Sequence, residues 1–430
     1  MKKLYLLLLC TILHLSADEI ELTVSGAQQA SMPIAIIVLD DSNTILNQLA
    51  EFIKKDLQFT DQFQPCIKKY NAQLPKKTLR KNIKKLSTAG IPLALCLNST
   101  SPENIQWRLY DTIQCTMIQA KNLTQKSSII RAWAHTIADE VWKTLTGNNG
   151  FFSSRIVYCK DSKNHKGHTI RKVYLADFDG THEELLVDVP TICVAPRWHP
   201  TKPHISYSEY ADTNVRLMSM GMDKKRKPLS NFDGINMLAS FSDNGVTMTY
   251  CSSRGSGSCQ IYLLKDNSLK RCTNNTGNNT SPIFINEDQL CFCSDFQTGS
   301  PQIYIANIHT GHLQRITPGG YCTSPSYCQK TNKIAYHKMI HGTMQVMMYD
   351  CATKTHAQVT KTKGSKHEVS WSPCGTQLLF AHEIPGKNSR LSSLNLLTSK
   401  TRYLTSAHEQ CSYPHWSPCY QTFPVVTSTI

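Results

Sequence analysis

The apolar positions of this 430-residue chain follow two different patterns, and the boundary between them lies near residue 150. From residue 155 onward, short runs rich in β-branched and aromatic residues alternate with turn-forming residues, which is typical of β-strands. One short motif around an aromatic anchor returns six times, at Trp198, Phe241, Phe284, Tyr327, Trp371 and Trp416. The steps between successive anchors are 43, 43, 43, 44 and 45 residues. A repeat of this length with several strands in each copy is typical of a β-propeller blade.

Each copy contains enough strand-like runs to supply four strands. In the copy anchored at Phe284, the runs after the anchor are Gln289–Cys293, Gln302–Ala306 and Leu313–Thr317. A blade cannot bury both of its faces alone, so the copies must stack side by side around an axis. A sandwich of uneven strands is the alternative fold, and the evenness of the repeat argues against it.

The two ends of the repeat region are incomplete in complementary ways. Before the first anchor lie three runs that match the second, third and fourth strands of a blade, namely Arg155–Tyr158, Val173–Ala176 and Glu184–Val187. The run at Trp416 matches a first strand with little behind it. Pairing these two fragments completes one blade and removes both free sheet edges. The sequence therefore predicts a closed ring of six blades, while Phe423–Thr427 is an extra tail without an assigned place.

The segment before residue 150 mixes strands with helices. Ile34–Leu39 and Leu93–Leu97 are continuous apolar runs of strand length, and Trp107–Tyr110 and Gln114–Ile118 are further strand candidates. This alternation predicts an α/β domain, smaller than the propeller. The fold class is thus mostly β, with an N-terminal α/β domain at residues 18–150 and a six-bladed propeller at residues 151–430.

Three helices are expected in this smaller domain. Apolar residues from Ile45 to Ile53 recur at helical spacing, with Asp40 to Ser42 as capping candidates. A lysine- and arginine-rich helix follows at about residues 76–86, and its charges read as a solvated face. The apolar stripe from Ile129 to Leu145 predicts a long helix that stops at Gly147.

The first seventeen residues have the pattern of a secretory signal peptide. Met1–Lys3 is basic, Leu4–Leu15 is apolar but too short to span a bilayer, and Ala17 offers a small residue at the cleavage position. We therefore expect residues 1–17 to be removed and the mature chain to be exported. No later run is apolar enough to predict a transmembrane segment.

The net charge and the cysteine content place few limits on the partners and disulfides of this protein. The formal net charge is +15, which suits anionic neighbours such as nucleic acid, phospholipid headgroups or wall polymer, but the dispersed charges favour a solvated basic surface over a dedicated anion site. Of 17 cysteines, Cys10 lies in the leader. Many of the others, such as Cys291 and Cys293, lie inside strand runs, where cysteine acts as a small apolar residue. Export permits disulfides, but the sequence does not specify their pairing.

The sequence offers no convincing catalytic or metal-binding motif. A propeller-capped serine peptidase would need a G-x-S-x-G elbow and a hydrolase domain, and the serines near Gly255 and Gly299 have the wrong spacing. His337 and His341 lie four residues apart, but without the glutamate of a zinc-binding H-E-x-x-H motif. We therefore predict a protein that is not an enzyme and has no cofactor or metal, with a propeller enzyme as the less favoured alternative.

The junction between the two predicted domains resembles a known family. It is similar to the interdomain junction of the TolB family in three consecutive pieces, namely His135–Gly147, Gly150-Phe-Phe and Arg155–Tyr158. That family is the periplasmic component of the Tol–Pal envelope system of Gram-negative bacteria. Val173–Gly180 and the Ser-Pro-x-aromatic blade starts also match, so the resemblance extends from about residue 20 to residue 418. The Pro-Asp-Gly turn of the family is degraded here, for example to Pro200-Thr-Lys.

The resemblance implies a binding function. TolB-like proteins bind the lipoprotein Pal through their propeller and a TolA-like inner-membrane protein through their N-terminus, with peptidoglycan nearby. They thereby support envelope integrity and outer-membrane constriction at cell division. A periplasmic location and no nucleic-acid partner are implied as well. The alternative function is a propeller scaffold for other periplasmic partners.

The resemblance also proposes contact residues. The TolA-like contact is carried over onto the mature N-terminal stretch, Asp18, Glu19, Ile20, Glu21, Leu22, Thr23 and Val24. Its alternation suits strand addition to a partner's sheet, although it could equally be the first strand of its own domain. The Pal-like contact is carried over onto one rim of the propeller, in loops just before the anchors. Its candidates are Asp233, Ile235, Leu238, Asn279, Thr280, Ser281, Tyr321, Thr323, His367 and Glu368.

Overall fold

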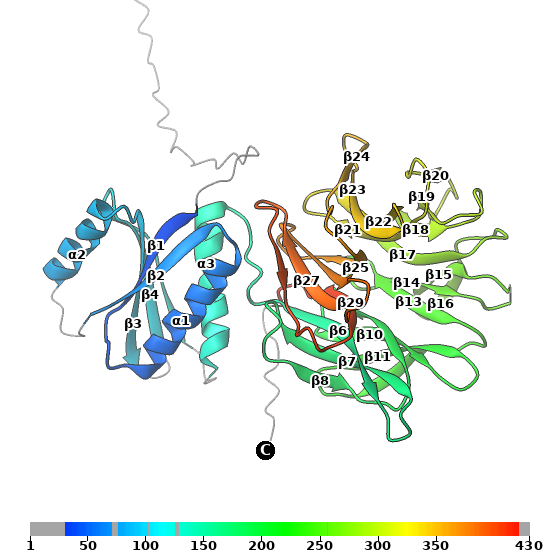
Figure 1. The fold of residues 1–430 in the computed structure, drawn as a ribbon, viewed down its shortest axis with the longest axis horizontal. Coiled ribbons are helices and arrows are strands. Elements are labelled where there is room, and N and C mark those ends of the chain that lie inside the picture. The colour runs from blue at the N-terminus through cyan, green and yellow to red at the C-terminus, as the bar shows by residue number, and fades with distance from the viewer. Residues whose placement is uncertain (1–30, 71–75, 102–103, 125–128, 256, 421–430) are drawn as a thin grey trace, which may run out of the picture.

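The fold was analysed in a computed structural model that describes residues 31–70, 76–101, 104–124, 129–255 and 257–420. The predicted signal peptide, the N-terminal stretch Asp18–Val24 and the tail Phe423–Thr427 lie outside these residues. Figure 1 shows an α/β unit beside a ring of β-sheets, with the segment after α3 running between them. Among the described residues, no helix is both long and apolar enough to cross a bilayer.

The N-terminal unit has one five-stranded sheet in the order β2-β1-β3-β4-β5. β1 pairs in parallel with β2 and β3, and the remaining pairs are antiparallel. Helices α1 and α3 pack against one face of the sheet, and α2 packs against the other. The elements are β1 (Met32–Val38), α1 (Thr44–Phe59), β2 (Phe63–Lys69), α2 (Lys76–Thr88), β3 (Leu93–Ser101), β4 (Asn104–Asp111), β5 (Thr116–Thr124) and α3 (Ile130–Thr146).

Three details of this unit correct the sequence prediction. The edge strand β2 was not predicted, because Pro65 and two lysines leave it without an apolar alternation. The strand expected at Gln114–Ile118 begins only at Thr116, since the Asp111 carboxylate accepts hydrogen bonds from the next residues and holds them in a turn. The cap of α1 is Asn43, whose side chain accepts from the Leu46 N–H at 3.1 Å, and not Asp40 to Ser42.

The other 24 described strands form six four-stranded antiparallel sheets, which confirms the six-bladed propeller. Blades one to three are β9 (Cys193–Trp198), β10 (His204–Tyr210), β11 (Val215–Gly221), β12 (Arg226–Ser230); β13 (Asn236–Phe241), β14 (Met248–Ser252), β15 (Gln260–Lys265), β16 (Ser268–Arg271); and β17 (Asn279–Asn286), β18 (Gln289–Ser294), β19 (Gln302–Asn307), β20 (Leu313–Arg315). Blades four to six are β21 (Cys322–Cys328), β22 (Lys333–Ile340), β23 (Thr343–Asp350), β24 (Thr355–Gln358); β25 (Ser365–Trp371), β26 (Gln377–Glu383), β27 (Arg390–Asn395), β28 (Thr401–Tyr403); and β29 (Cys411–Trp416), β6 (Arg155–Lys163), β7 (Thr169–Asp177), β8 (Glu184–Val187).

The sixth blade joins the two ends of the propeller region, as predicted. β29 pairs antiparallel with β6, and Trp416 lies opposite Ile156. The side chain of Trp416 is buried and donates its indole N–H to the Ser154 hydroxyl at 2.6 Å. Because β29 comes from the end of the chain and β6 from its middle, this pairing closes the ring.

The aromatic anchors hold neighbouring blades together. Trp371, at the end of β25, packs among Ala335 and Val346 of the preceding blade. Its indole N–H also reaches that blade, donating to the Ser326 carbonyl at 3.0 Å. Burial of a large aromatic surface between blades explains why an aromatic residue returns with every repeat.

Every innermost strand carries the same backbone irregularity. The residue three positions before each anchor has a left-handed backbone, with φ between 51° and 59°, in Ala195, Leu238, Ser281, Ser324, Glu368 and Tyr413. The register of each inner strand shifts at this point, as it does between Met237 and Ser240. Such a bulge bends the strand and redirects its side chains, which is a common device next to binding sites.

The junction between the two units is a compact turn built on one carboxylate. Asp139 of α3 accepts the backbone N–H groups of Phe152 at 2.8 Å and Ser153 at 3.0 Å. A Cβ on Gly150 would lie 2.0 Å from this carboxylate, so only glycine allows the close approach. Phe151 and Phe152 are fully buried beside Trp142. These contacts explain the Gly-Phe-Phe motif of the sequence in physical terms.

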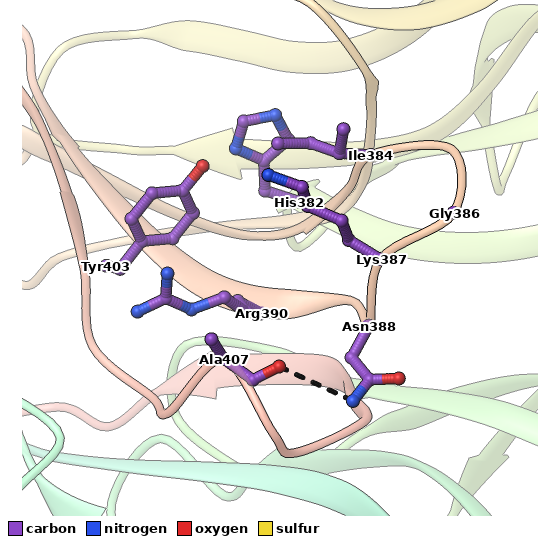
Figure 2. A pocket seen from close by; sticks show the side chains of 8 residues that line it. All are labelled: His382, Ile384, Gly386, Lys387, Asn388, Arg390, Tyr403 and Ala407. Carbon is purple, nitrogen blue, oxygen red and sulfur yellow. Dashed lines mark hydrogen bonds between the residues drawn. The ribbon is translucent and has the colours of Figure 1, made fainter.

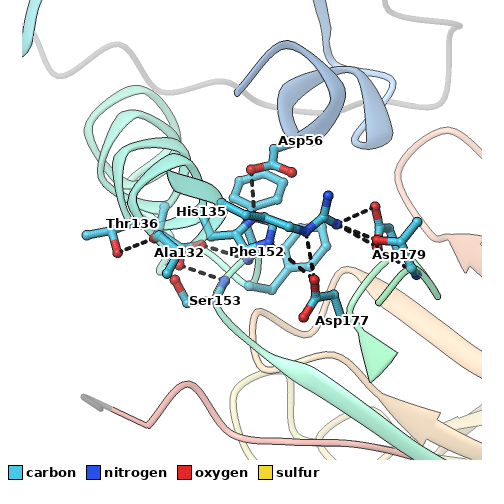
Figure 3. Close-up of polar contacts among 12 residues, drawn as sticks. Asp56, Ala132, His135, Thr136, Phe152, Ser153, Asp177 and Asp179 are labelled. Atoms are coloured by element: carbon cyan, nitrogen blue, oxygen red, sulfur yellow. Dashed lines mark hydrogen bonds and ion pairs between the residues drawn. The ribbon is translucent and has the colours of Figure 1, made fainter. Parts of the chain in front are cut away.

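A buried polar network also joins the two units. Figure 3 shows His135 of α3 between Asp56 of α1 and Asp177 of β7. The His135 Nδ1 lies 2.8 Å from Asp56, and its Nε2 lies 3.9 Å from Asp177. Arg131 of α3 donates to Asp177 at 2.7 Å and to Asp179 at 2.9 Å. Acids from the propeller are therefore neutralised by bases of the N-terminal unit.

The N-terminal unit covers one end of the propeller. In a four-stranded antiparallel blade, the first-to-second and third-to-fourth hairpins lie at one end, and the second-to-third hairpin and the loop to the next blade lie at the other. The contacts with the N-terminal unit involve third-to-fourth hairpins, since Asp179 follows β7 and Asn395 of β27 donates to the Thr60 carbonyl at 2.6 Å. We call this end the domain rim and the opposite end the open rim.

Candidate functional site

The residues predicted for the Pal-like contact are all brought to the open rim. Asp233 and Ile235 lie in the exposed loop between β12 and β13. Tyr321 is 45% exposed just before β21, and Thr323 is partly buried two residues later. His367 is half-buried near the start of β25 and lies 3.3 Å from Glu383. These side chains come from three of the six blades, namely those that begin with β13, β21 and β25.

The remaining predicted residues lie on the same side of the propeller but below the surface of the open rim. Asn279 is fully buried, and its amide donates to the carbonyl of Gly277 at 3.1 Å and to the side chain of Asn275 at 2.9 Å. The structure therefore excludes Asn279 as a surface contact, because its polar atoms hold the preceding loop in shape. Thr280 and the bulge residues Leu238, Ser281 and Glu368 are partly buried.

The open rim carries most of the propeller's exposed apolar side chains. Ten large apolar residues are exposed in the described part of the propeller, and eight of them lie at this rim. The eight are Ile192, Tyr210, Phe232, Ile235, Phe296, Tyr321, Met339 and Tyr403. Exposed apolar side chains that lie together on a surface are a common feature of protein-binding surfaces. We call this set the apolar ring.

Backbone hydrogen bonds arrange part of the apolar ring in pairs. Ile192 precedes β9 and accepts the Tyr210 N–H at 3.0 Å, and Tyr321 accepts the Met339 N–H at 2.9 Å. Each pair joins a loop between blades to the adjacent second-to-third hairpin. Phe232 is covered by the Arg254 guanidinium, which lies 3.8 Å from the ring centroid.

The sequence analysis did not predict six of these eight residues, although most of them recur at a fixed distance from an anchor. Ile192, Ile235 and Tyr321 all lie six positions before an anchor, and Tyr210, Phe296 and Met339 all lie twelve positions after one. Reading every repeat at these two offsets would have identified four of the six missed residues, namely Ile192, Tyr210, Phe296 and Met339. The two offsets are fixed by blade geometry, since equivalent positions of equivalent blades lie at the same rim.

The mouth of the ring contains a titratable acid. Burial raises the pKa of the Glu368 carboxyl to about 7, although the Tyr413 N–H and the guanidinium groups of Arg197 and Arg171 oppose this shift. Burial, reinforced by Arg197, also lowers the pKa of His415, so its ring is neutral at neutral pH. His415 Nδ1 instead accepts the Trp198 N–H at 3.2 Å.

The described residues contain no group of three or more side chains that could hold a metal ion. His337, considered above as a ligand, is buried within β22, and burial together with His367 lowers its pKa to about 3. Its neighbour in the sequence motif, His341, lies in the turn after β22 with φ of 48°.

Comparisons with known proteins agree with this architecture. A family model described as the TolB beta propeller domain matches residues 142–420. The Tol-Pal system protein TolB of Gluconobacter oxydans is 29% identical over 263 residues, which are 60% of this chain and 56% of that protein. The corresponding protein of Francisella tularensis subsp. tularensis is 31% identical over 210 residues, which are 47% of each chain. The matches thus span about half the length of these curated relatives.

The fold comparison reaches further along the chain. The crystal structure of TolB from Acinetobacter baumannii matches with a TM-score of 0.77 and 24% sequence identity, covering 91% of this chain and 98% of that one. At this identity the match shows a shared fold, including the N-terminal unit. Because the family model covers more than half of the sequence and its span contains all six blades, the chain belongs to the TolB propeller family.

Proposed function

We propose that this protein is a periplasmic, non-enzymatic component of a Tol–Pal system, in which its propeller binds a Pal-like lipoprotein and its N-terminus binds a TolA-like protein. Membership of the TolB family supports the system, since the curated relatives carry the name Tol-Pal system protein TolB. In this role the protein would support envelope integrity and outer-membrane constriction at division. The predicted signal peptide supports the location.

The observation that carries the proposal is the apolar ring on the open rim. The N-terminal unit occupies the domain rim, so the open rim is the end of the propeller that is left for a partner. Aromatic side chains such as Tyr321 and Phe232, which are exposed at this rim, are common anchors of protein interfaces. This arrangement suits a protein partner better than a small substrate.

The first test is co-purification from envelope extracts with the intact protein. We expect a Pal-like lipoprotein to be recovered with the wild type, and at least tenfold less of it with the double variant Ile235→Glu/Tyr321→Glu, because charge on exposed apolar anchors prevents their burial. The matched control is Val246→Glu/Leu397→Glu, which alters two exposed apolar residues on the domain rim, 53% and 37% exposed. Recovery of unrelated partners alone would reject the Tol–Pal assignment, and equal loss with the control variant would reject the open rim.

The second test concerns the TolA-like contact, which rests on the sequence of residues 18–24. Deleting these residues from the mature protein is expected to weaken binding to a TolA-like periplasmic domain at least tenfold and to leave binding of the Pal-like protein unchanged. Strand addition depends on backbone hydrogen bonds that the deletion removes. Binding assays with each purified partner measure both affinities. Equal loss of both would show that the segment has a structural role instead.

A further inference from the structure

The fifth blade differs from its neighbours at the open rim. The position five residues before each anchor is fully buried in all six blades, as Cys193, Asn236, Asn279, Cys322, Lys366 and Cys411. Lys366 is the one charged member of this set. Its ammonium group donates to the carbonyl oxygens of Gly364 at 2.8 Å and Lys363 at 3.3 Å. Burial lowers the pKa of Lys366 to about 8, so the group still carries its charge at pH 7.

A pocket of about 490 Å³ opens on this blade. It is formed by the hairpin between β26 and β27 and by the segment after β28, both of which belong to the open rim. Figure 2 shows Lys387, Arg390 and Tyr403 around this pocket, with His382 at its back. His382 lies opposite Lys366 in the pairing of β25 and β26, so the buried charge adjoins the pocket wall.

The positive charge of the pocket is not balanced by an acid in its wall. No aspartate or glutamate is among the described residues that line it. The Arg390 guanidinium donates to the Thr405 carbonyl at 2.9 and 2.7 Å and lies 3.8 Å from the Tyr403 ring centroid. Glu383, at the end of β26, pairs with His367 instead. The pocket therefore favours an anionic ligand.

His382 closes the back of the pocket with a buried ring and presents no accessible donor to a ligand. The residue is only 6% exposed, and its Nε2 lies 2.9 Å from the Lys363 carbonyl, which makes Nε2 the donor. Nδ1 is buried and has no hydrogen-bond partner among the described residues. Burial lowers the pKa of His382, and Lys366 and Arg390 oppose its protonation further. His382 therefore lines the pocket as a buried ring, and the charge of an anionic ligand would be met by Lys387 and Arg390.

We propose that this pocket binds an acidic peptide segment, with carboxylates held by Lys387 and Arg390 and with apolar groups lying on Tyr403 and Ile384. The pocket is large enough to hold the side chains of a short peptide, and it is larger than a single small anion requires. Tyr403 also belongs to the apolar ring, so one partner can occupy both. The inference rests on the proposed function in one respect, namely that a protein covers the open rim.

The test uses the purified mature protein and a fluorescein-labelled hexaglutamate peptide, followed by fluorescence anisotropy at low ionic strength. Lys387→Glu is expected to weaken binding about tenfold, because an attractive charge becomes repulsive. Lys387 lies on an exposed hairpin, so folding is preserved. Arg390→Gln is a second variant that removes charge from the wall. The matched control is Lys225→Glu, which makes the same charge change on the highly exposed hairpin between β11 and β12 at the domain rim.

The control variant is expected to change the affinity less than twofold. Equal weakening by Lys387→Glu and Lys225→Glu would overturn the proposal, since the peptide would then sense only the net charge. Competition separates the peptide from a free anion. Inorganic phosphate that displaced the peptide at the peptide's own concentration would show a small-anion site and overturn the peptide assignment. The assay contains no Pal-like protein, so failure of the co-purification and failure of the pocket are separate results.

Discussion

Replacing Trp416 with alanine is expected to lower the free energy of unfolding of the propeller by about 3–5 kcal/mol. Trp416 is 3% exposed, its indole N–H is bonded to Ser154, and its ring lies 5.8 Å from that of Phe151. The substitution leaves a cavity at the point where β29 meets β6 and the N-terminal unit. Because this blade alone joins distant parts of the chain, the loss weakens the closure of the whole ring.

Calorimetric unfolding of the wild type and the variant measures the effect and separates the transitions of the two units. Leu397→Ala is the matched control, because Leu397 is a large apolar residue that is 37% exposed on the domain rim. It is expected to cost less than about 0.5 kcal/mol, as is usual for surface substitutions. A loss below 1 kcal/mol for Trp416→Ala would contradict the role of β29 in closure.

The blade repeat could be predicted because the buried surface repeats with the sequence. Trp198, Phe284 and Trp416 are each buried against a neighbouring blade, so every copy must place a large apolar side chain at the same position. The pairing of β29 with β6 followed from the missing strands at the two ends. Both inferences use local patterns and a closure rule, and neither requires knowledge of side-chain positions.

Features that depend on which partner each polar side chain bonds, or on loops meeting in space, could not be predicted. The cap of α1 is Asn43 because the turn of Asp40 and Ser42 uses those polar groups locally. Asn279 reads as a polar loop residue, but the loop folds over it and buries it. The pocket of blade five combines residues from a hairpin and an interblade loop, which no periodic pattern brings together.

Replacing Asp177 with asparagine is expected to destabilise the contact between the two units by about 3 kcal/mol, because it leaves buried cations without their counter-charge. Burial alone would raise the pKa of Asp177, but His135, Arg131 and Arg155 outweigh it and lower the pKa to about 2. Burial alone would lower the pKa of His135, but Asp56 and Asp177 outweigh it and raise the pKa to about 9. Each group therefore stabilises the charge of the other.

The pH dependence follows from these two shifts. The pKa of Asp177 is lowered from 3.8 to about 2, so its stabilisation is present above pH 3.8 and is lost as the pH falls through 2. The pKa of His135 is raised from 6.5 to about 9, so its stabilisation is present below pH 6.5 and is lost as the pH rises through 9. The difference in unfolding free energy between wild type and Asp177→Asn should therefore be largest at about pH 4–6.5 and shrink toward pH 9.5.

Denaturant unfolding across this pH range measures that difference, and proteolysis in the junction at 147–154 reports separation of the two units. Glu140→Gln is the matched control, since it also changes an acid to an amide. Glu140 pairs with Lys121 at 2.6 Å, but both side chains are about one-third exposed or more, and such surface pairs contribute less than about 1 kcal/mol. A pH-independent difference for Asp177→Asn would mean that the carboxylate acts only through packing. A difference that shrinks as His135 loses its proton would instead show that charge holds the N-terminal unit on the domain rim, which keeps the opposite rim open to a partner.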